Sequence, residues 1–242
     1  MGGFKETKMN WINLKILVSI TLFFSFIGVS KAECKKDIDL SKVRIGIVGD
    51  SFFTTSMGEP GSFASSLADA FNTKEVENSA IGGSKVLGFG SNTIIKQKLM
   101  KAPDILIFGG GGNDFVECGS DKNCLSKKLN SIVSPNLEYG GFIKLLAKHS
   151  NKNTYSIILY PTVVGDSAPP NYQYLIQSGL GIKYAKRMQD FAASIPNLIW
   201  IDAGYILDKS NREHWRTDGY HPSSKAYELL SKKVLKNFCA AE

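Results

Sequence analysis

Ser51 and His221 are the two residues of this chain whose neighbours best suit them to nucleophilic chemistry. Ser51 closes the run Gly49-Asp50-Ser51, and His221 follows Asp218 by three residues in a turn that contains a glycine. A serine hydroxyl is a poor nucleophile unless an imidazole takes its proton, and the imidazole needs a carboxylate to fix its tautomer. One loop can supply both Asp218 and His221, which favours acyl-transfer chemistry at Ser51.

Other residues compete with this pair. Gly-Asp-Ser occurs a second time as Gly165-Asp166-Ser167, which lies among prolines and is predicted to be a loop. Taken alone, either copy is more often a turn than a nucleophile. His214 is a rival base, but it lacks a carboxylate at a comparably compact spacing, and His149 is expected to cap the end of a helix.

The elements that must position these residues alternate along the chain beyond residue 40. Short apolar runs, of which 105–108 is the clearest, are typical of a parallel sheet covered on both faces. The alternation predicts one three-layer α/β domain with a mostly parallel sheet. Strands are predicted at 43–48, 75–78, 105–108, 155–160 and 198–202, and helices at 62–71, 93–100, 141–149, 184–195 and 223–238.

Four polar or glycine-rich clusters fall at one edge of this predicted sheet, where sites form in parallel α/β folds. Three follow strands, at 49–51, 78–83 and 109–114, and the fourth, 218–222, precedes the last helix. Each cluster is a weak signal by itself, because glycines and short polar side chains are also common in ordinary turns. Their predicted location on one edge is the stronger argument for a site.

These clusters resemble the four blocks of the SGNH (GDSL-type) hydrolase family, in the same order and at similar spacing over residues 43–238. The resemblance implies a flavodoxin-like α/β/α sandwich of about five strands. It assigns Ser51 as nucleophile, with Asp218 and His221 completing the triad. The backbone N–H groups of Ser51 and Gly83 and the side-chain amide of Asn113 then bind the oxyanion. Gly82 adjoins Gly83, so this glycine is assigned to within one residue.

Two details of the clusters are not part of this chemistry. Asp50 and Asp114 are expected to organise their own loops rather than join the reaction. Phe52-Phe53, directly after the serine, are bulkier than is usual in the family, which leaves the shape of the entrance open.

The resemblance implies a carboxylic ester hydrolase that works through an acyl-serine intermediate and requires no metal or organic cofactor. No long apolar lid segment follows residue 40, which favours small acyl groups such as acetyl on a glycan. Tyr172, Tyr174 and Trp215 are predicted to lie in loops, where they either wall the site or pack as ordinary loop residues.

The predicted partner is a small-molecule or glycan ester. A lysophospholipase or thioesterase, an acetyltransferase and a non-catalytic glycan-binding module remain open alternatives. The lysines are scattered, so nucleic-acid binding is not expected, and membrane contact is at most peripheral. The oligomeric state is left open.

The N-terminus predicts export. Lys5, Lys8 and Lys15 precede an apolar run at 16–29, and Ser30-Lys31-Ala32 has the small residues of a cleavage site. Residues 1–32 are therefore predicted to be a signal peptide and 33–242 a single domain, located in the periplasm or outside the cell. An uncleaved anchor and a lipoprotein modified at Cys34 are the alternatives. The predicted mature chain carries a net charge of +4 rather than the +7 of the whole sequence.

All four cysteines lie beyond the predicted cleavage site, and an even number in an exported chain indicates disulfides. Cys118–Cys124 would close a short loop, and Cys34–Cys239 would join the two ends of the domain. Zinc binding is not expected, because neither the cysteine spacing nor the three histidines form a ligand set.

Overall fold

Five parallel strands form the centre of the structure, a computed structural model that describes residues 38–54, 61–85, 103–133, 154–160, 163–177 and 179–240. The strand order is β2-β1-β3-β4-β5, which is the flavodoxin-like order. The predicted α/β/α fold is confirmed. The strands are β1 (Ile45–Gly49), β2 (Val76–Asn78), β3 (Ile105–Gly109), β4 (Tyr155–Tyr160) and β5 (Leu198–Asp202).

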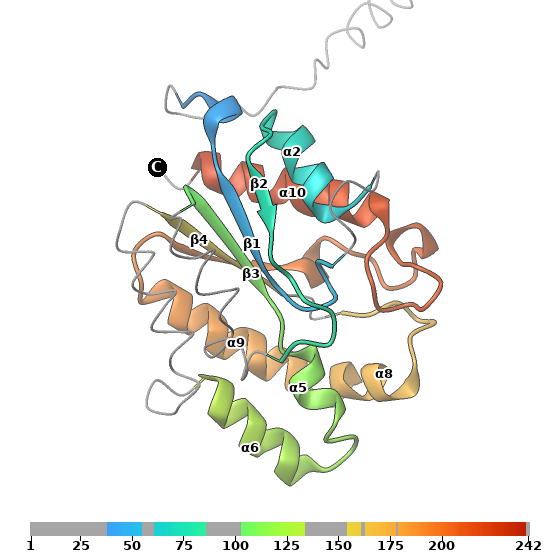
Figure 1. Ribbon diagram of the computed structural model, residues 1–242. Helices are drawn as coiled ribbons and strands as arrows, with labels where there is room; N and C mark the ends of the chain where they lie inside the picture. Colours follow the sequence, from blue (N-terminus) through green and yellow to red (C-terminus); the bar gives the residue numbers. More distant parts are fainter. Residues whose placement is uncertain are drawn as a thin grey trace, which may run out of the picture. The chain divides into compact units, whose positions relative to one another are not determined.

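Helices cover both faces of this sheet (Figure 1). On one face lie α2 (Phe63–Phe71) and α10 (Ser224–Ala240), and on the other lie α5 (Gly112–Val116), α6 (Lys122–Val133), α8 (Pro170–Gln177) and α9 (Leu180–Ala193). Successive strand residues point to opposite faces, so Ile107 packs with the first group and Phe108 with the second. The strands are therefore apolar throughout, as the sequence indicates.

All five predicted strands are present, with boundaries that differ by no more than two residues from those expected. The helix predicted at 62–71 begins one residue later, because Ser62 acts as its N-cap and accepts a hydrogen bond from the Ser65 N–H at 3.0 Å. The helices predicted at 93–100 and 141–149, and His149 with them, lie outside the described residues.

Among the α-helices of the described segments, three were not predicted: α5, α6 and α8. Helix α5 begins within a glycine run, and α8 begins at Pro170, where the fixed φ and missing N–H of proline suit the first helical turn. The prediction that Tyr172 and Tyr174 lie in loops is wrong, since both are on α8.

A disulfide joins Cys118 to Cys124, as predicted, and connects the segment after α5 to α6. Cys239 is also disulfide-bonded. Its predicted partner, Cys34, lies outside the described residues, as does the predicted signal peptide. Within the part of the chain that the structure describes, no helix has the length and apolar character needed to span a membrane.

Candidate active site

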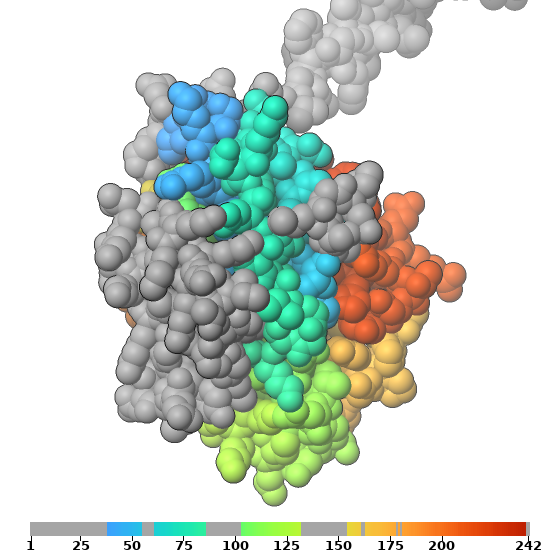
Figure 2. Space-filling view, in the orientation of Figure 1, coloured from blue at the N-terminus to red at the C-terminus, as the bar shows by residue number. Residues whose placement is uncertain are grey.

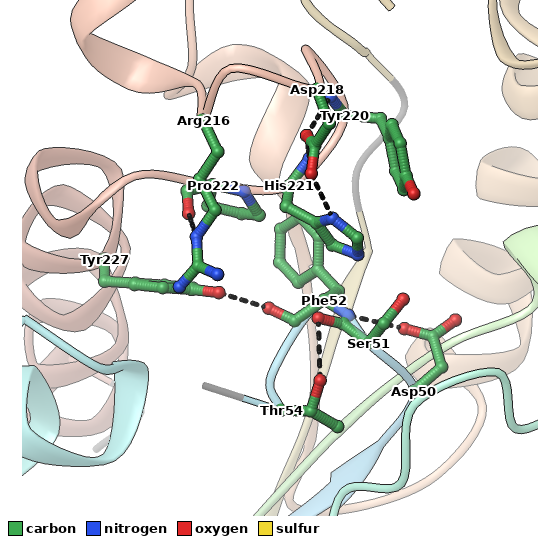
Figure 3. Close-up of polar contacts among 10 residues, drawn as sticks. All are labelled: Asp50, Ser51, Phe52, Thr54, Arg216, Asp218, Tyr220, His221, Pro222 and Tyr227. Atoms are coloured by element: carbon green, nitrogen blue, oxygen red, sulfur yellow. Dashed lines mark hydrogen bonds and ion pairs between the residues drawn. The ribbon is translucent and has the colours of Figure 1, made fainter. Parts of the chain in front are cut away.

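Ser51 lies in the tight loop that follows β1, and two side chains from distant elements anchor this loop. The Tyr227 hydroxyl of α10 donates to the Phe52 carbonyl at 2.9 Å, and the Asn78 amide donates to the Phe53 carbonyl at 2.7 Å. The Asp50 carboxylate accepts the Phe52 N–H at 3.0 Å (Figure 3). The Ser51 backbone is therefore fixed by the sheet, by α10 and by its own loop.

The packing of the Phe53 ring requires glycine at the ends of two neighbouring strands, Gly49 of β1 and Gly109 of β3. Its ring is fully buried and stacks on Phe63 of α2, with the ring centroids 5.0 Å apart. A Cβ atom at Gly49 would lie 2.4 Å from the Phe53 ring, and one at Gly109 would lie equally close. Phe53, two residues after the serine, is thus a core anchor, and Phe52, which is also buried, lines the pocket described below.

Asp218 and His221 form the pair that their spacing indicates. His221 Nδ1 lies 2.8 Å from Asp218 Oδ2, while Asp218 Oδ1 accepts the backbone N–H groups of Tyr220 and His221, each at 3.0 Å. Burial alone would raise the pKa of Asp218, but the hydrogen bonds from His221 and Tyr220 together lower it below its usual value. The carboxylate is therefore held in its charged form, which favours the His221 tautomer with a proton on Nδ1.

The other ring nitrogen of His221 is available to Ser51. Nε2 is buried and has no hydrogen-bond partner. The imidazole lies over Ser51 in Figure 3, with this second nitrogen turned toward the serine side chain. An imidazole oriented from one side and open on the other has the geometry of a general base.

The second Gly-Asp-Ser copy lies in a loop, as predicted, and this loop supports the one that carries His221. The Gly165 N–H donates to the Gly219 carbonyl at 2.7 Å. Gly219 has a φ of 73°, and a Cβ atom there would lie 2.6 Å from Ser167 Oγ. A glycine is therefore needed between Asp218 and His221 for both its conformation and its small size.

Asn113, on α5, is connected to the turn that contains Gly83. Its Nδ2 donates to the Ser84 carbonyl at 3.0 Å, and the Ser84 N–H closes a turn on Ile81 at 3.1 Å. Gly83, at the third position of this turn, has a φ of 74°, whereas Gly82 has no positive φ. Figure 2 shows the surface of residues 61–85 bordering that of α5 and α6.

The same contacts show which N–H groups of Ser51, Gly83 and Asn113 remain available to bind an oxyanion. An amide nitrogen carries two N–H bonds, so Asn113 keeps one donor beyond its contact with Ser84. Among the described residues, the backbone N–H groups of Ser51 and Gly83 have no acceptor. Asn113 lines the pocket beside Ser51 and His221, whereas Gly83 is an exposed residue of the adjoining turn.

Ser51, Asn113 and His221 line one pocket of ≈ 70 Å³. Tyr172 of α8 stacks on Tyr220 with centroids 4.3 Å apart, and Tyr220 in turn contacts the His221 ring at 4.2 Å. Tyr172 thus walls the site. Tyr220 was not predicted to be a site residue, although its position between Asp218 and His221 was a signal.

Trp215, Tyr174 and His214 do not line this pocket. Trp215 is buried in the core and donates from Nε1 to the Asp208 carbonyl at 2.9 Å. The Tyr174 hydroxyl donates to the Ser120 carbonyl at 3.3 Å. Nδ1 of His214, the rival base, accepts the Asp208 N–H at 2.8 Å, which makes this histidine part of a loop. Ordinary packing is therefore the correct interpretation for Trp215 and Tyr174.

Asp50 is a buried carboxyl group at the floor of the pocket. Burial, with a contribution from the nearby charge of Asp114, raises the pKa of Asp50 to about 7. The folded protein therefore keeps the Asp50 proton to a higher pH than the unfolded chain does. This carboxyl contributes stability that is fully present below about pH 4 and is lost as the pH rises toward 7.

We expect Asp50→Asn to remove the loss of folding stability that the Asp50 carboxyl causes as the pH rises from about 4 to about 7. Between pH 4 and 7 the free energy of unfolding of the wild type should fall by about 2–4 kcal/mol more than that of the variant. Urea unfolding at a series of pH values measures the difference. Asp69→Asn, which replaces an exposed carboxylate on α2, is the control. Equal slopes for Asp50→Asn and the wild type would show that Asp50 titrates normally.

No group of three or more histidine, cysteine, aspartate or glutamate side chains in the described segments is placed to hold a metal ion. The polar groups around Ser51 are instead a hydroxyl, an imidazole paired with a carboxylate, and an amide donor. Ser51 follows β1, Asn113 follows β3, and Asp218 and His221 lie in the turn before α10. A flavodoxin-like sheet that carries these groups has the arrangement expected of an α/β/α hydrolase of the serine type.

The comparison with known families identifies the class further. The sequence profile of the GDSL-like Lipase/Acylhydrolase family matches residues 47–229, which is most of the chain. The protein therefore belongs to this family and is an ester hydrolase. No curated protein sequence matches it.

Solved structures share the fold at low sequence identity. An acetylxylan esterase from Geobacillus stearothermophilus is 17% identical, with a TM-score of 0.55 over 81% of this chain and 94% of its own. A lipase from the goat rumen metagenome is 18% identical, with a TM-score of 0.57 over 83% of this chain and 100% of its own. At these identities the similarity establishes a common fold.

Proposed function

We propose that this protein is an exported carboxylic ester hydrolase that removes small acyl groups, such as acetyl, from a glycan or another small ester. The observation that carries the proposal is the Asp218–His221 pair, whose open Nε2 is turned toward Ser51 in a small pocket. Export is supported by the order of basic, apolar and small residues at 1–32. The Cys118–Cys124 disulfide is typical of oxidising compartments and adds to this support.

The chemistry has two steps. His221 Nε2 takes the proton of Ser51 Oγ, which attacks the acyl carbon, and the tetrahedral intermediate breaks down as His221 returns the proton to the leaving alcohol. Water, deprotonated by His221, then attacks the acyl-serine and releases the acid. Asp218 stays ionised and stabilises the imidazolium. The N–H groups of Ser51 and Gly83 and the amide of Asn113 hold the oxyanion.

The size of the pocket favours a short acyl group. Its volume of ≈ 70 Å³ is well below the roughly 300–1,000 Å³ of sites that enclose drug-sized ligands. Phe115, Tyr160 and Leu175 give the pocket an apolar wall that suits a methyl group but leaves little room for a long chain. The acetylxylan esterase named above has the same fold, which is compatible with this substrate class.

A series of p-nitrophenyl esters tests the proposal. We expect kcat/KM for the acetate to exceed that for the palmitate by about 10-fold or more, because excess methylenes cannot enter a filled apolar pocket without a cost of about 1–3 kcal/mol. A serine-directed phosphonate should label the protein at Ser51. A rise of kcat/KM with chain length would instead favour a lysophospholipase or thioesterase, and failure of both labelling and hydrolysis would leave a binding module.

Replacement of Asn113 tests the oxyanion assignment. Loss of one such donor typically lowers kcat by about 100–1,000-fold, so Asn113→Ala should lose activity on p-nitrophenyl acetate to that extent with little change in KM. Because Asn113 also holds the Ser84 carbonyl, Ser84→Ala serves as a control that keeps this backbone contact. A loss of less than 10-fold in Asn113→Ala would remove Asn113 from the oxyanion site.

A further inference from the structure

A second concave surface lies along the edge of the sheet, beside the pocket. β5 is the last strand of the described sheet, and the groove beside it is lined by residues of α9, α10 and β5 and has a volume of ≈ 1070 Å³. Ile176 of α8 lines both this groove and the pocket that contains Ser51 and His221. The groove and the pocket therefore adjoin at Ile176.

The groove contains the exposed large hydrophobic side chains of the described chain. Tyr205, after β5, is 93% exposed, and Ile182 on α9 is 67% exposed. These are the two large hydrophobic residues that the described segments expose, and both line the groove, together with Trp200. Trp200 is half-buried and stacks on Tyr160, so Tyr205 is the exposed aromatic ring of the groove. Exposed apolar side chains gathered at a hollow surface mark a binding site more often than scattered ones do.

The groove is also positively charged. Lys232, Lys233 and Lys236 line it from α10, and within the described residues none of them has an ion-pair partner. A fourth lining lysine, Lys186, pairs with Asp190. The acidic lining residue, Asp202, accepts the Gly204 N–H at 2.8 Å. The three α10 lysines thus leave an excess of positive charge along one wall.

We infer that this groove binds an acidic glycan, a chain of sugars that bear carboxylates, and presents its ester to Ser51. Sugar rings stack on exposed aromatic side chains such as Tyr205, and carboxylates pair with the α10 lysines. A concave groove of this volume suits a polymer chain better than a flat lipid surface, which calls for an apolar face that inserts between headgroups. Presentation of the ester rests on the proposed function, whereas binding does not.

Direct binding tests the inference without any turnover. Affinity for an oligogalacturonate is measured by calorimetry in the Ser51→Ala background, alone and with Lys232→Gln, Lys233→Gln and Lys236→Gln combined. We expect the triple substitution to weaken binding about 10-fold and to reduce its dependence on salt, since each charge contact is modest. The control combines Lys74→Gln, Lys122→Gln and Lys127→Gln, which remove the same charge from exposed positions outside the groove and should change affinity less than about 2-fold.

Two further measurements separate the contribution of the Tyr205 ring to binding from that of the α10 lysines. Tyr205→Ala should weaken binding of both oligogalacturonate and a neutral xylo-oligosaccharide, while the lysine substitutions should affect the acidic sugar alone. The inference is overturned if oligogalacturonate does not bind, if both lysine sets weaken it equally, or if the α10 lysines control sedimentation with anionic phospholipid vesicles instead. Wild-type hydrolysis of p-nitrophenyl acetate, measured in parallel, reports on the proposed function separately.

Discussion

Ser51→Ala is expected to reduce kcat/KM for p-nitrophenyl acetate by about 10⁴-fold or more, because no acyl-enzyme forms without the hydroxyl. The fold should be unaffected, since the Ser51 loop is held through its backbone by Tyr227 and Asn78 rather than through the serine side chain. The residual rate should come from the oxyanion donors, which remain in place. Initial rates, with the melting temperature measured alongside, check the prediction.

The chain supplies its own matched control for this experiment. Ser167 closes the second Gly-Asp-Ser run and is exposed in the loop that contacts Gly219. Ser167→Ala removes the same hydroxyl from the same local sequence and should keep activity within about 3-fold of the wild type, as expected for an exposed surface substitution. If Ser167→Ala abolished activity and Ser51→Ala did not, the assignment of the nucleophile would be wrong.

Asp218→Asn should lower kcat by about 10³–10⁴-fold with a much smaller effect on KM. An asparagine oxygen can still accept the backbone N–H groups of Tyr220 and His221, so the loop should keep its shape. The amide cannot stabilise the imidazolium, and it favours the wrong His221 tautomer. The pH dependence of kcat, measured for variant and wild type, separates this effect from a loss of folding.

His214→Asn is the control for the second experiment. His214 accepts the Asp208 N–H through Nδ1, and an asparagine can supply an acceptor in a similar position. The activity of the His214→Asn variant should stay within about 3-fold of the wild type, because an interaction within a loop mainly affects stability. Retention of more than a tenth of the wild-type kcat by Asp218→Asn would mean that another group orients His221.

Most of the fold could be predicted from the sequence, because it depends on local pattern. The apolar runs gave the five strands to within two residues, and Ser62 marked the start of α2. The polar clusters after β1, β2 and β3 were placed on one edge because parallel strands end on the same side. Helices α5 and α8 were missed because α5 starts among glycines and α8 at a proline, and both residue types are usually associated with turns. Helix α6 was also missed.

By itself, the sequence determined the chain order of the strands and which serine, histidine and aspartate have neighbours suited to acyl transfer. Tertiary structure alone decided that Trp215 is core, that Tyr172 stacks on Tyr220, and that the groove along β5 meets the pocket at Ile176. These outcomes depend on contacts between segments far apart in the chain, as between Tyr227 and Phe52. Periodicity and turn chemistry describe neighbours along the backbone, whereas only the packing of whole elements brings such distant side chains together.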